Sequence, residues 1–267
     1  MLAVQRHKLI VEELRRHGAV RVSELTELLD VSEMTVRRDL DALAADGLLE
    51  KVHGGATLRG HLSADEPGFE AKSHRQLREK EAIAREAARL VSPGQSIGLT
   101  AGTTTWRLAH HLARVPDLTV VTNSIQVANI FHSAPRPDLT VVLTGGVRTP
   151  SDALVGPMAL ASIRSLHLDL LFLGVHGVTA DAGLTTPNLL EAETDRALVA
   201  ASQRRIVVAD HTKWGVRGLS RIAGLDEVHV FVSDAGLSVD ARAAIGEHAE
   251  RVLIASPRRR NGDGGPV

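Results

Sequence analysis

Apolar side chains recur every three or four positions through the first 45 residues, which is the period of helices with one buried face. The clearest stripe is Val36, Leu40 and Leu43, and it predicts a helix over 32–45 that begins on a Ser32 cap. About three residues separate this helix from the one before it, a spacing typical of a helix-turn-helix. The other helices expected here are 4–17 and 23–29.

The outward face of the third helix carries polar and cationic side chains. Met34 and Arg38 lie opposite the apolar stripe, and Thr35 and Arg37 lie beside it. A helix that reads a DNA major groove needs a short cationic face of this kind, with groups that hydrogen-bond. The alternative is an ordinary solvated face.

A hairpin is expected directly after this helix, over 48–58. Gly54-Gly55 can supply the positive φ angles of a tight turn. Lys51 and His53 would lie near its tip, where they suit contact with DNA phosphates or the minor groove. Helix, turn, helix and hairpin in this order predict a winged helix-turn-helix that binds DNA. The alternative is a surface hairpin that only completes a small core.

A different pattern begins at Ser96, where short apolar runs alternate with helical stretches. The predicted strands are 96–99, 118–121, 139–143, 168–173, 205–209, 228–232 and 251–254. This alternation predicts an α/β domain with a mostly parallel sheet covered by helices on both faces. The expected organisation is an α+β winged helix-turn-helix over 1–58, a polar linker over 59–78, the α/β domain over 79–255 and a tail over 256–267.

Polar residues follow these strands, at the edge where open α/β sheets bind ligands. The first strand leads into Thr100-Ala101-Gly102-Thr103-Thr104-Thr105, whose small residues and hydroxyls at a helix start suit a phosphate. At any single position, capping of the strand end is an equally good explanation. The other residues that we expect at a shared ligand site here are Asn123, Gly145, Gly146, Arg148, His176 and Lys213.

The charge balance limits how the chain can hold DNA. The 267 residues have a formal net charge of −1, and residues 1–58 hold eight Lys or Arg against ten Asp or Glu, a net charge of −2. Bulk attraction to DNA is therefore absent, and binding must rest on a few placed cations.

The remaining composition excludes several classes of protein. The chain has no cysteine, which excludes disulfides, thiolate metal sites and a Cys nucleophile. Its histidines lack metal-site spacing, so we expect neither a metal ion nor a cofactor. No apolar run approaches the ~20 residues of a membrane span, and Arg6, His7 and Lys8 interrupt any leader, so a cytoplasmic protein with no membrane partner is expected.

The stretch VSEMTVRRDLDALAADGLLEKVHGGA resembles the signature of the DeoR family of bacterial transcriptional regulators, and the likeness extends from Arg6 to Ala56. In that family this segment is a winged helix-turn-helix that binds double-stranded operator DNA. The resemblance implies two groups of DNA-binding residues: Ser32, Met34, Thr35, Arg37 and Arg38 on the recognition helix, and Lys51, His53 and Gly54 on the wing.

The second half resembles the C-terminal sensor domain of the same family through AGTTTWRLA, VTNSIQVAN, LTGGVR, EAETDRALV and VVADHTKWG. That domain is similar in fold to ribose-5-phosphate isomerase and typically senses a phosphorylated sugar or a related intermediate. Two departures matter, because the family commonly has acidic residues where this chain has Thr100 and His176. The effector residues implied by the resemblance are Gly102, Thr103, Thr104, Thr105, Asn123, Gly145, Gly146, Arg148 and Lys213.

Three functions remain open on the sequence. The favoured hypothesis is a repressor of carbohydrate metabolism genes that is controlled by a phosphorylated sugar and acts as a homo-oligomer, because one short recognition helix covers too few bases. The second is a sugar-phosphate isomerase fused to a DNA-binding module, which the incomplete carboxylate set weakens. The third is a scaffold whose winged helix contacts protein.

Overall fold

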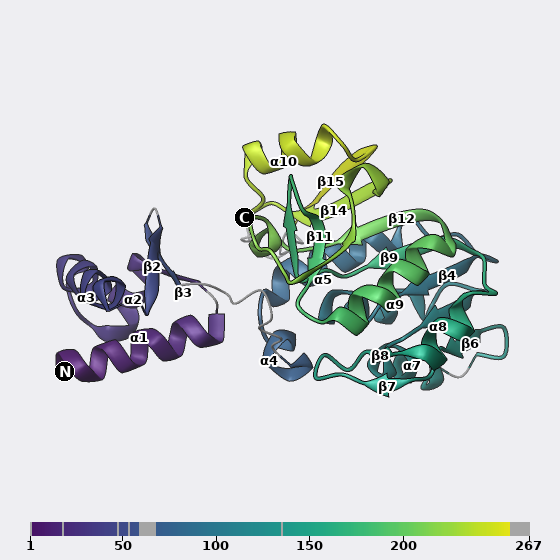
Figure 1. The fold of residues 1–267 in the computed structure, drawn as a ribbon, viewed down its shortest axis with the longest axis horizontal. Coiled ribbons are helices and arrows are strands. Elements are labelled where there is room, and N and C mark those ends of the chain that lie inside the picture. The colour runs from purple at the N-terminus through teal and green to yellow at the C-terminus, as the bar shows by residue number, and fades with distance from the viewer. Residues whose placement is uncertain are drawn as a thin grey trace, which may run out of the picture. The chain divides into compact units, whose positions relative to one another are not determined.

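The computed structural model describes residues 2–17, 19–46, 48–52, 54–58, 68–134 and 136–256. The chain divides into two compact units, 1–63 and 64–267 (Figure 1). None of the described helices combines the length and the apolar character that crossing a membrane requires.

The N-terminal unit packs three helices on a small antiparallel sheet. The helices are α1 (Ala3–His17), α2 (Val22–Leu29) and α3 (Glu33–Ala45), and the sheet has the order β1 (Ala19–Arg21), β3 (Gly55–Leu58), β2 (Leu49–Val52). Ser32 caps α3 as expected, and Val36, Leu40 and Leu43 face the core. The predicted winged helix-turn-helix is confirmed.

The turn of the wing differs from the expectation that Gly54 and Gly55 share it. Gly54 alone has a positive φ, of 79°. Gly55 is the first residue of β3 and lies opposite Val52 and Arg21. A Cβ on Gly55 would lie 2.1 Å from the carbonyl oxygen of Val20, so this glycine permits close strand packing and does not form the turn.

The C-terminal unit is built on a seven-stranded sheet in which every pairing is parallel. The strand order is β15 (Arg251–Ala255), β14 (Val230–Asp234), β12 (Ser202–Val208), β9 (Leu168–Leu173), β4 (Ser96–Leu99), β5 (Thr119–Thr122), β6 (Thr140–Leu143). The chain starts in the middle at β4, runs outward to β6 and returns to β9 on the other side. Connections therefore diverge between β4 and β9, which is where such sheets bind ligands.

Helices cover both faces of this sheet, as predicted. One layer holds α5 (Leu77–Ala88), α6 (Thr103–Leu112) and α7 (Ile125–His132), packed around Leu99, Phe172 and Val208. The other holds α8 (Pro157–Ile163), α9 (Leu189–Ala200) and α10 (Val239–Gly246), packed around Leu171, Leu173 and Val207.

The C-terminal unit also contains several smaller elements outside the seven-stranded sheet. They are the hairpin β7 (Val147–Arg148) and β8 (Leu154–Val155), the antiparallel sheet β10 (Gly177–Thr179), β11 (Gly183–Thr186) and β13 (Ser220–Ala223), and the short helices η1 (His211–Lys213) and η2 (Leu225–Glu227). The strands β10, β11 and β13 are not among those predicted from the sequence.

The segment read as a linker is structured at its C-terminal end. It contains α4 (Phe69–Ser73), and α5 begins at Leu77. Phe69 is held by a backbone bond to the carbonyl of Pro150 (3.2 Å), a partner 81 residues away that no local pattern indicates. Residues 59–67 and 257–267 lie outside the described part of the chain.

Candidate functional site

The outward face of α3 presents the side chains that the periodicity places there. Met34, Arg37 and Arg38 are exposed, with Met34 at 67%. Thr35 is half-buried, and Arg37 Nη2 lies 3.4 Å from Glu33 Oε2, one turn earlier on the same helix. Exposed pairs of this kind add little stability, so Arg37 is available to DNA at small cost.

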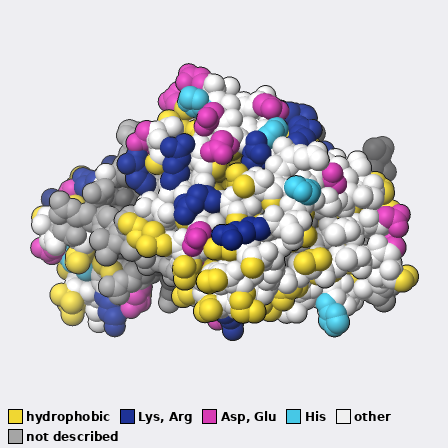
Figure 2. Space-filling model, turned by 45° about the vertical axis from the view of Figure 1, so that its right-hand side comes forward, with side chains coloured by type: hydrophobic (Ala, Val, Ile, Leu, Met, Phe, Trp, Pro, Cys, Tyr) yellow, Lys and Arg dark blue, Asp and Glu magenta, His cyan; other side chains and the backbone are white. Residues whose placement is uncertain are grey.

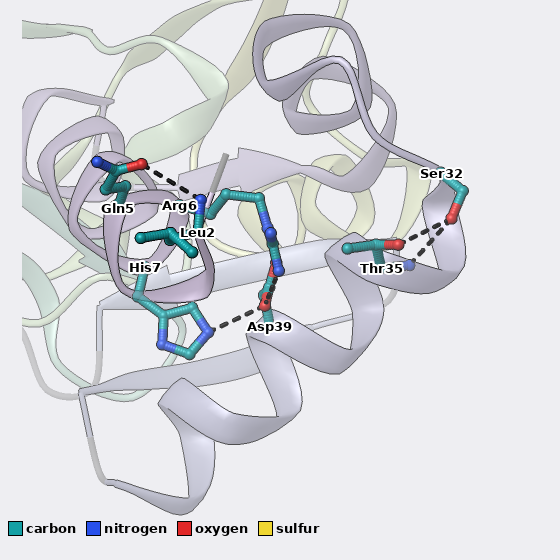
Figure 3. Close-up of polar contacts among 7 residues, drawn as sticks. All are labelled: Leu2, Gln5, Arg6, His7, Ser32, Thr35 and Asp39. Carbon is teal, nitrogen blue, oxygen red and sulfur yellow. Dashed lines mark hydrogen bonds and ion pairs between the residues drawn. The ribbon is translucent and has the colours of Figure 1, made fainter.

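Ser32 and Thr35 form the start of the helix (Figure 3). The hydroxyl of Ser32 accepts from the Thr35 backbone N–H at 3.3 Å and lies 2.9 Å from Thr35 Oγ1. These two residues therefore cap the helix in the absence of DNA. Their exposed position still suits a phosphate at the helix N-terminus.

Asp39 fixes α3 to α1. Although it lies on the charged helix, only 5% of it is exposed. Arg6 donates from Nε (2.7 Å) and Nη2 (3.0 Å) to its two carboxylate oxygens, and His7 Nε2 lies 3.0 Å from Oδ1 (Figure 3). Burial alone would raise the pKa of Asp39, but the hydrogen bonds from Arg6 and His7 outweigh it, so the pKa is lowered. This clamp orients the recognition helix and was missed by the sequence reasoning.

The wing residue Lys51 forms an ion pair within the N-terminal unit. Its ammonium pairs with Asp41 of α3, and both side chains are about half exposed. The pair links the wing to α3. Gly54 is exposed between the two strands, and His53 lies outside the described residues.

The expected phosphate loop lies at the carboxyl end of β4, where Gly102 (φ 153°) leads into α6. Thr103, Thr104 and Thr105 are all buried in its first turn. The Thr105 hydroxyl donates to the Gly102 carbonyl at 2.9 Å. The helix start thus offers backbone N–H groups lined by small polar side chains, which is an environment for an anion.

Two neighbouring strand ends shape this loop. Asn123, after β5, accepts from the Ala101 N–H through Oδ1 at 2.8 Å. Thr100 accepts from the Gly174 N–H, after β9, at 3.0 Å. Both side chains are almost fully buried. Asn123 therefore positions the loop, and the Thr100 hydroxyl is tied to the backbone.

The other expected ligand residues also follow strand ends, but not all are brought together. Gly145 and Gly146 follow β6 with positive φ, and a Cβ on Gly146 would lie 2.4 Å from the Val155 carbonyl. Arg148, in β7 beyond the edge strand, is exposed and donates to Asp152 at 2.6 Å. His176 follows β9 and donates its backbone N–H to Thr185. Lys213 lies in η1, after β12.

The structure adds Lys80, which the sequence reasoning missed. It lies on α5, is only 4% exposed, and donates to the Lys72 carbonyl at 2.7 Å. Burial lowers the pKa of Lys80 to about 8, with the cations Lys213, Arg107 and Lys72 acting in the same direction and Asp210 opposing them. Lys80 is thus a buried cation with three further cations and the carboxylate of Asp210 in its surroundings.

One sequence signal pointed to Lys80. It stands three, four and seven residues before Ile83, Ala84 and Ala87, on the buried stripe of its helix. In the view of Figure 2, Lys and Arg side chains also gather on the surface beside a band of hydrophobic ones.

Comparison with known families covers both units. The DeoR-like helix-turn-helix domain matches residues 6–60, and the DeoR C-terminal sensor domain matches residues 75–235. An HTH-type transcriptional regulator of Listeria innocua, GolR, is 37% identical over 88% of this chain and 91% of its own length. The glycerol-3-phosphate regulon repressor of Escherichia coli is 32% identical over 93% of this chain and 97% of its own length.

Among solved structures, ribose 5-phosphate isomerase A from Methanocaldococcus jannaschii is similar over 52% of this chain and 55% of its own, with 18% identity and a TM-score of 0.38. The whole-length relatives are named as transcriptional regulators, and both family domains occur here in their order. The chain therefore belongs to the DeoR family of helix-turn-helix transcriptional regulators.

Proposed function

We propose that this regulator represses genes of carbohydrate metabolism and that a phosphorylated sugar, bound at the carboxyl ends of β4, β9 and β12, controls its hold on operator DNA. The observation that carries the proposal is Lys80, a buried ammonium that lies near the further cations Lys213, Arg107 and Lys72. A buried charge of this kind needs an anionic partner, and the adjacent start of α6 offers backbone donors to the same anion.

The names of two relatives indicate which class of ligand to test first. One is named for a glycerol-3-phosphate regulon and another for the aga operon, so small phosphorylated carbohydrates are the first compounds to test. We assign the phosphate to Thr103, Thr104, Thr105, Lys80 and Lys213. Gly102 lets the loop approach the ligand, and Asn123, Gly145, Gly146 and His176 border the remainder. Arg148 reaches the ligand only by leaving Asp152.

A thermal-shift screen tests this assignment. Glycerol 3-phosphate, fructose 1-phosphate and fructose 6-phosphate are compared with glycerol and fructose. A true ligand at about 100 times its Kd adds roughly 2.7 kcal/mol to the free energy of unfolding, whereas the uncharged counterpart adds nothing. Equal shifts with and without the phosphate would contradict the proposal.

The ligand is sensed and not converted. An isomerase needs a base to move a proton, and Thr100, which replaces a family carboxylate, is buried and hydrogen-bonded to Gly174. The check is an aldose–ketose interconversion assay with the same sugar phosphates. Turnover clearly above the uncatalysed rate would favour the enzymatic alternative.

DNA contact is assigned to the outward face of α3 and to the wing. Arg37, Arg38, Met34 and Thr35 face base edges, while Ser32, Lys51, His53 and Gly54 face the backbone. Each chain reads one half-site, so a homo-oligomer on a two-fold symmetric operator follows.

A further inference from the structure

The helix α4 is a short element between the end of the winged helix and the sensor fold. It has five residues, none of them buried, and it follows directly on residues 59–67 in the chain. A helix this short has no stability of its own in water. Its position therefore depends on a few identifiable contacts with the rest of the C-terminal unit.

Phe69 and Lys72 make three of these contacts. The Phe69 N–H donates to the Pro150 carbonyl at 3.2 Å, and its ring meets Trp106 of α6 edge-on with centroids 5.9 Å apart. Lys72 Nζ donates to the Ser151 hydroxyl at 2.8 Å, and Ser151 is buried. Both Pro150 and Ser151 belong to the loop between β7 and β8.

The fourth contact comes from the proposed ligand site itself. Lys80 Nζ donates to the carbonyl of Lys72, near the end of α4. An ammonium has three N–H donors, so Lys80 can hold this carbonyl and an anion at the same time. Trp106 and Arg107 lie in α6, whose first turn carries Thr103 to Thr105, so the Phe69 contact also joins α4 to the helix that would bind the anion.

We propose that α4 is the element that reports occupancy of the sensor site to the DNA-binding unit. The inference rests on the proposed function. A bound phosphate keeps Lys80 fully charged and fixed in place, which strengthens its bond to Lys72 and holds α4 against α6 and the β7–β8 loop. Without the anion, α4 is released more often, and residues 68–76 then lengthen the connection between the two units.

A longer connection matters because two winged helices must meet two half-sites. The effective concentration of the second winged helix at its half-site depends on the length of chain that joins it to the first winged helix. The same ammonium serves α4 and the ligand, so the two binding events share a coupling free energy. The state of α4 therefore changes operator affinity, although α4 itself touches neither ligand.

The contacts of α4 can be removed without altering the residues assigned to the phosphate. Phe69→Ala removes the ring contact with Trp106, and Ser151→Ala removes the hydroxyl that accepts from Lys72. Leu219→Ala is a matched control, since Leu219 is an exposed apolar residue of the same unit. All variants are made in the full chain.

The experiment has three readouts. Calorimetry measures binding of glycerol 3-phosphate, the fructose phosphates and inorganic phosphate. Affinity is then measured for an operator duplex selected from random DNA, and the third readout is the ratio of operator affinities with and without the anion that binds. In wild type and Leu219→Ala we expect a ratio of at least about fivefold, within the usual range of allosteric coupling. In Phe69→Ala and Ser151→Ala, anion and DNA still bind, but the ratio falls to within about twofold of one.

Amide hydrogen exchange gives a second, independent measurement. In wild type the anion slows exchange in the peptide spanning 69–76, and this slowing is lost in Phe69→Ala. Wild-type ratios in both variants, or exchange that does not respond to the anion, would overturn the role of α4 while leaving the ligand site intact. If the wild-type chain binds none of these anions, the proposed function fails and the role of α4 falls with it.

Discussion

The ammonium of Lys80 is held in a place that favours its neutral form. Burial lowers the pKa of Lys80 to about 8, with three further cations acting in the same direction and Asp210 opposing them. An unfolded chain would bind this proton up to pH ~10.4. Between these two values the unfolded state binds more protons than the folded state, so the free energy of unfolding should rise with pH in that window.

This shift predicts how ligand affinity depends on pH. A phosphate monoester becomes a dianion as pH rises through about 6, and Lys80 loses its charge as pH rises through its pKa of about 8. We expect affinity for the active sugar phosphate to rise, peak near neutrality and fall above pH 8. Calorimetry across pH should show the alkaline fall in wild type and in the control Lys8→Met, but not in Lys80→Met.

The pKa of Asp39 is also lowered, but for a carboxyl group this means that the fold favours the charged form. The stability that its bonds to Arg6 and His7 contribute is present above the ordinary Asp pKa and is lost as pH falls through the lowered value. Asp39→Asn removes the carboxylate charge that Arg6 and His7 bind and should destabilise the N-terminal unit.

The measurement is hydrogen exchange of the Val36 and Leu40 amides in the full chain. Asp41→Asn is the control on the same helix, and losing its exposed pair with Lys51 should cost less than about 1 kcal/mol. Equal losses in the two variants would show that Asp39 is not the clamp.

At the scale of elements, the recognition helix should carry most of the sequence selectivity. Arg37 and Arg38 are its two exposed cations, and a good bidentate contact to guanine contributes about 1–3 kcal/mol. The double variant Arg37→Ala, Arg38→Ala should therefore weaken operator binding by at least about tenfold while leaving the unfolding of α3 unchanged. Arg164→Ala, at the C-cap of α8, is the control, and unchanged operator affinity in the double variant would refute the assignment of α3.

The element boundaries were largely available from sequence because burial follows helical and strand periods. Val36, Leu40 and Leu43 set the face of α3, and the apolar runs set the strands of the large sheet. The strands β10, β11 and β13 were not predicted, because each has only three or four residues, too few to show a clear pattern.

The location of the two candidate sites was predictable from the sequence, but the contacts of their side chains were not. Strand-end residues reach one rim because the strands are parallel, yet the partner of each side chain depends on distant chain segments. Asp39 and Lys80 illustrate this limit. Both occupy an apolar stripe of their helix, which marks them as buried charges, but only the fold reveals Arg6 for one and the Lys72 carbonyl for the other.

For the molecule as a whole, the proposed oligomer has a measurable signature. If two winged helices act together, a duplex with two half-sites separated by about one helical turn, 10–10.5 bp, or a multiple of it, should bind far more tightly than one half-site. Light scattering of the complex should then give two or more chains per duplex. A single chain bound to the full operator would contradict this expectation.

The pair between Lys51 and Asp41 bears on how the regulator searches a genome. Any stretch of DNA offers phosphates, and affinity for random sequence comes mainly from such backbone contacts. If Lys51 contacts DNA as proposed, it must first give up this carboxylate and gains less from each phosphate, and the net negative charge of the unit opposes binding further. Because a genome presents about a million or more competing sites, we expect this internal carboxylate to leave a larger share of the protein free to reach its operator.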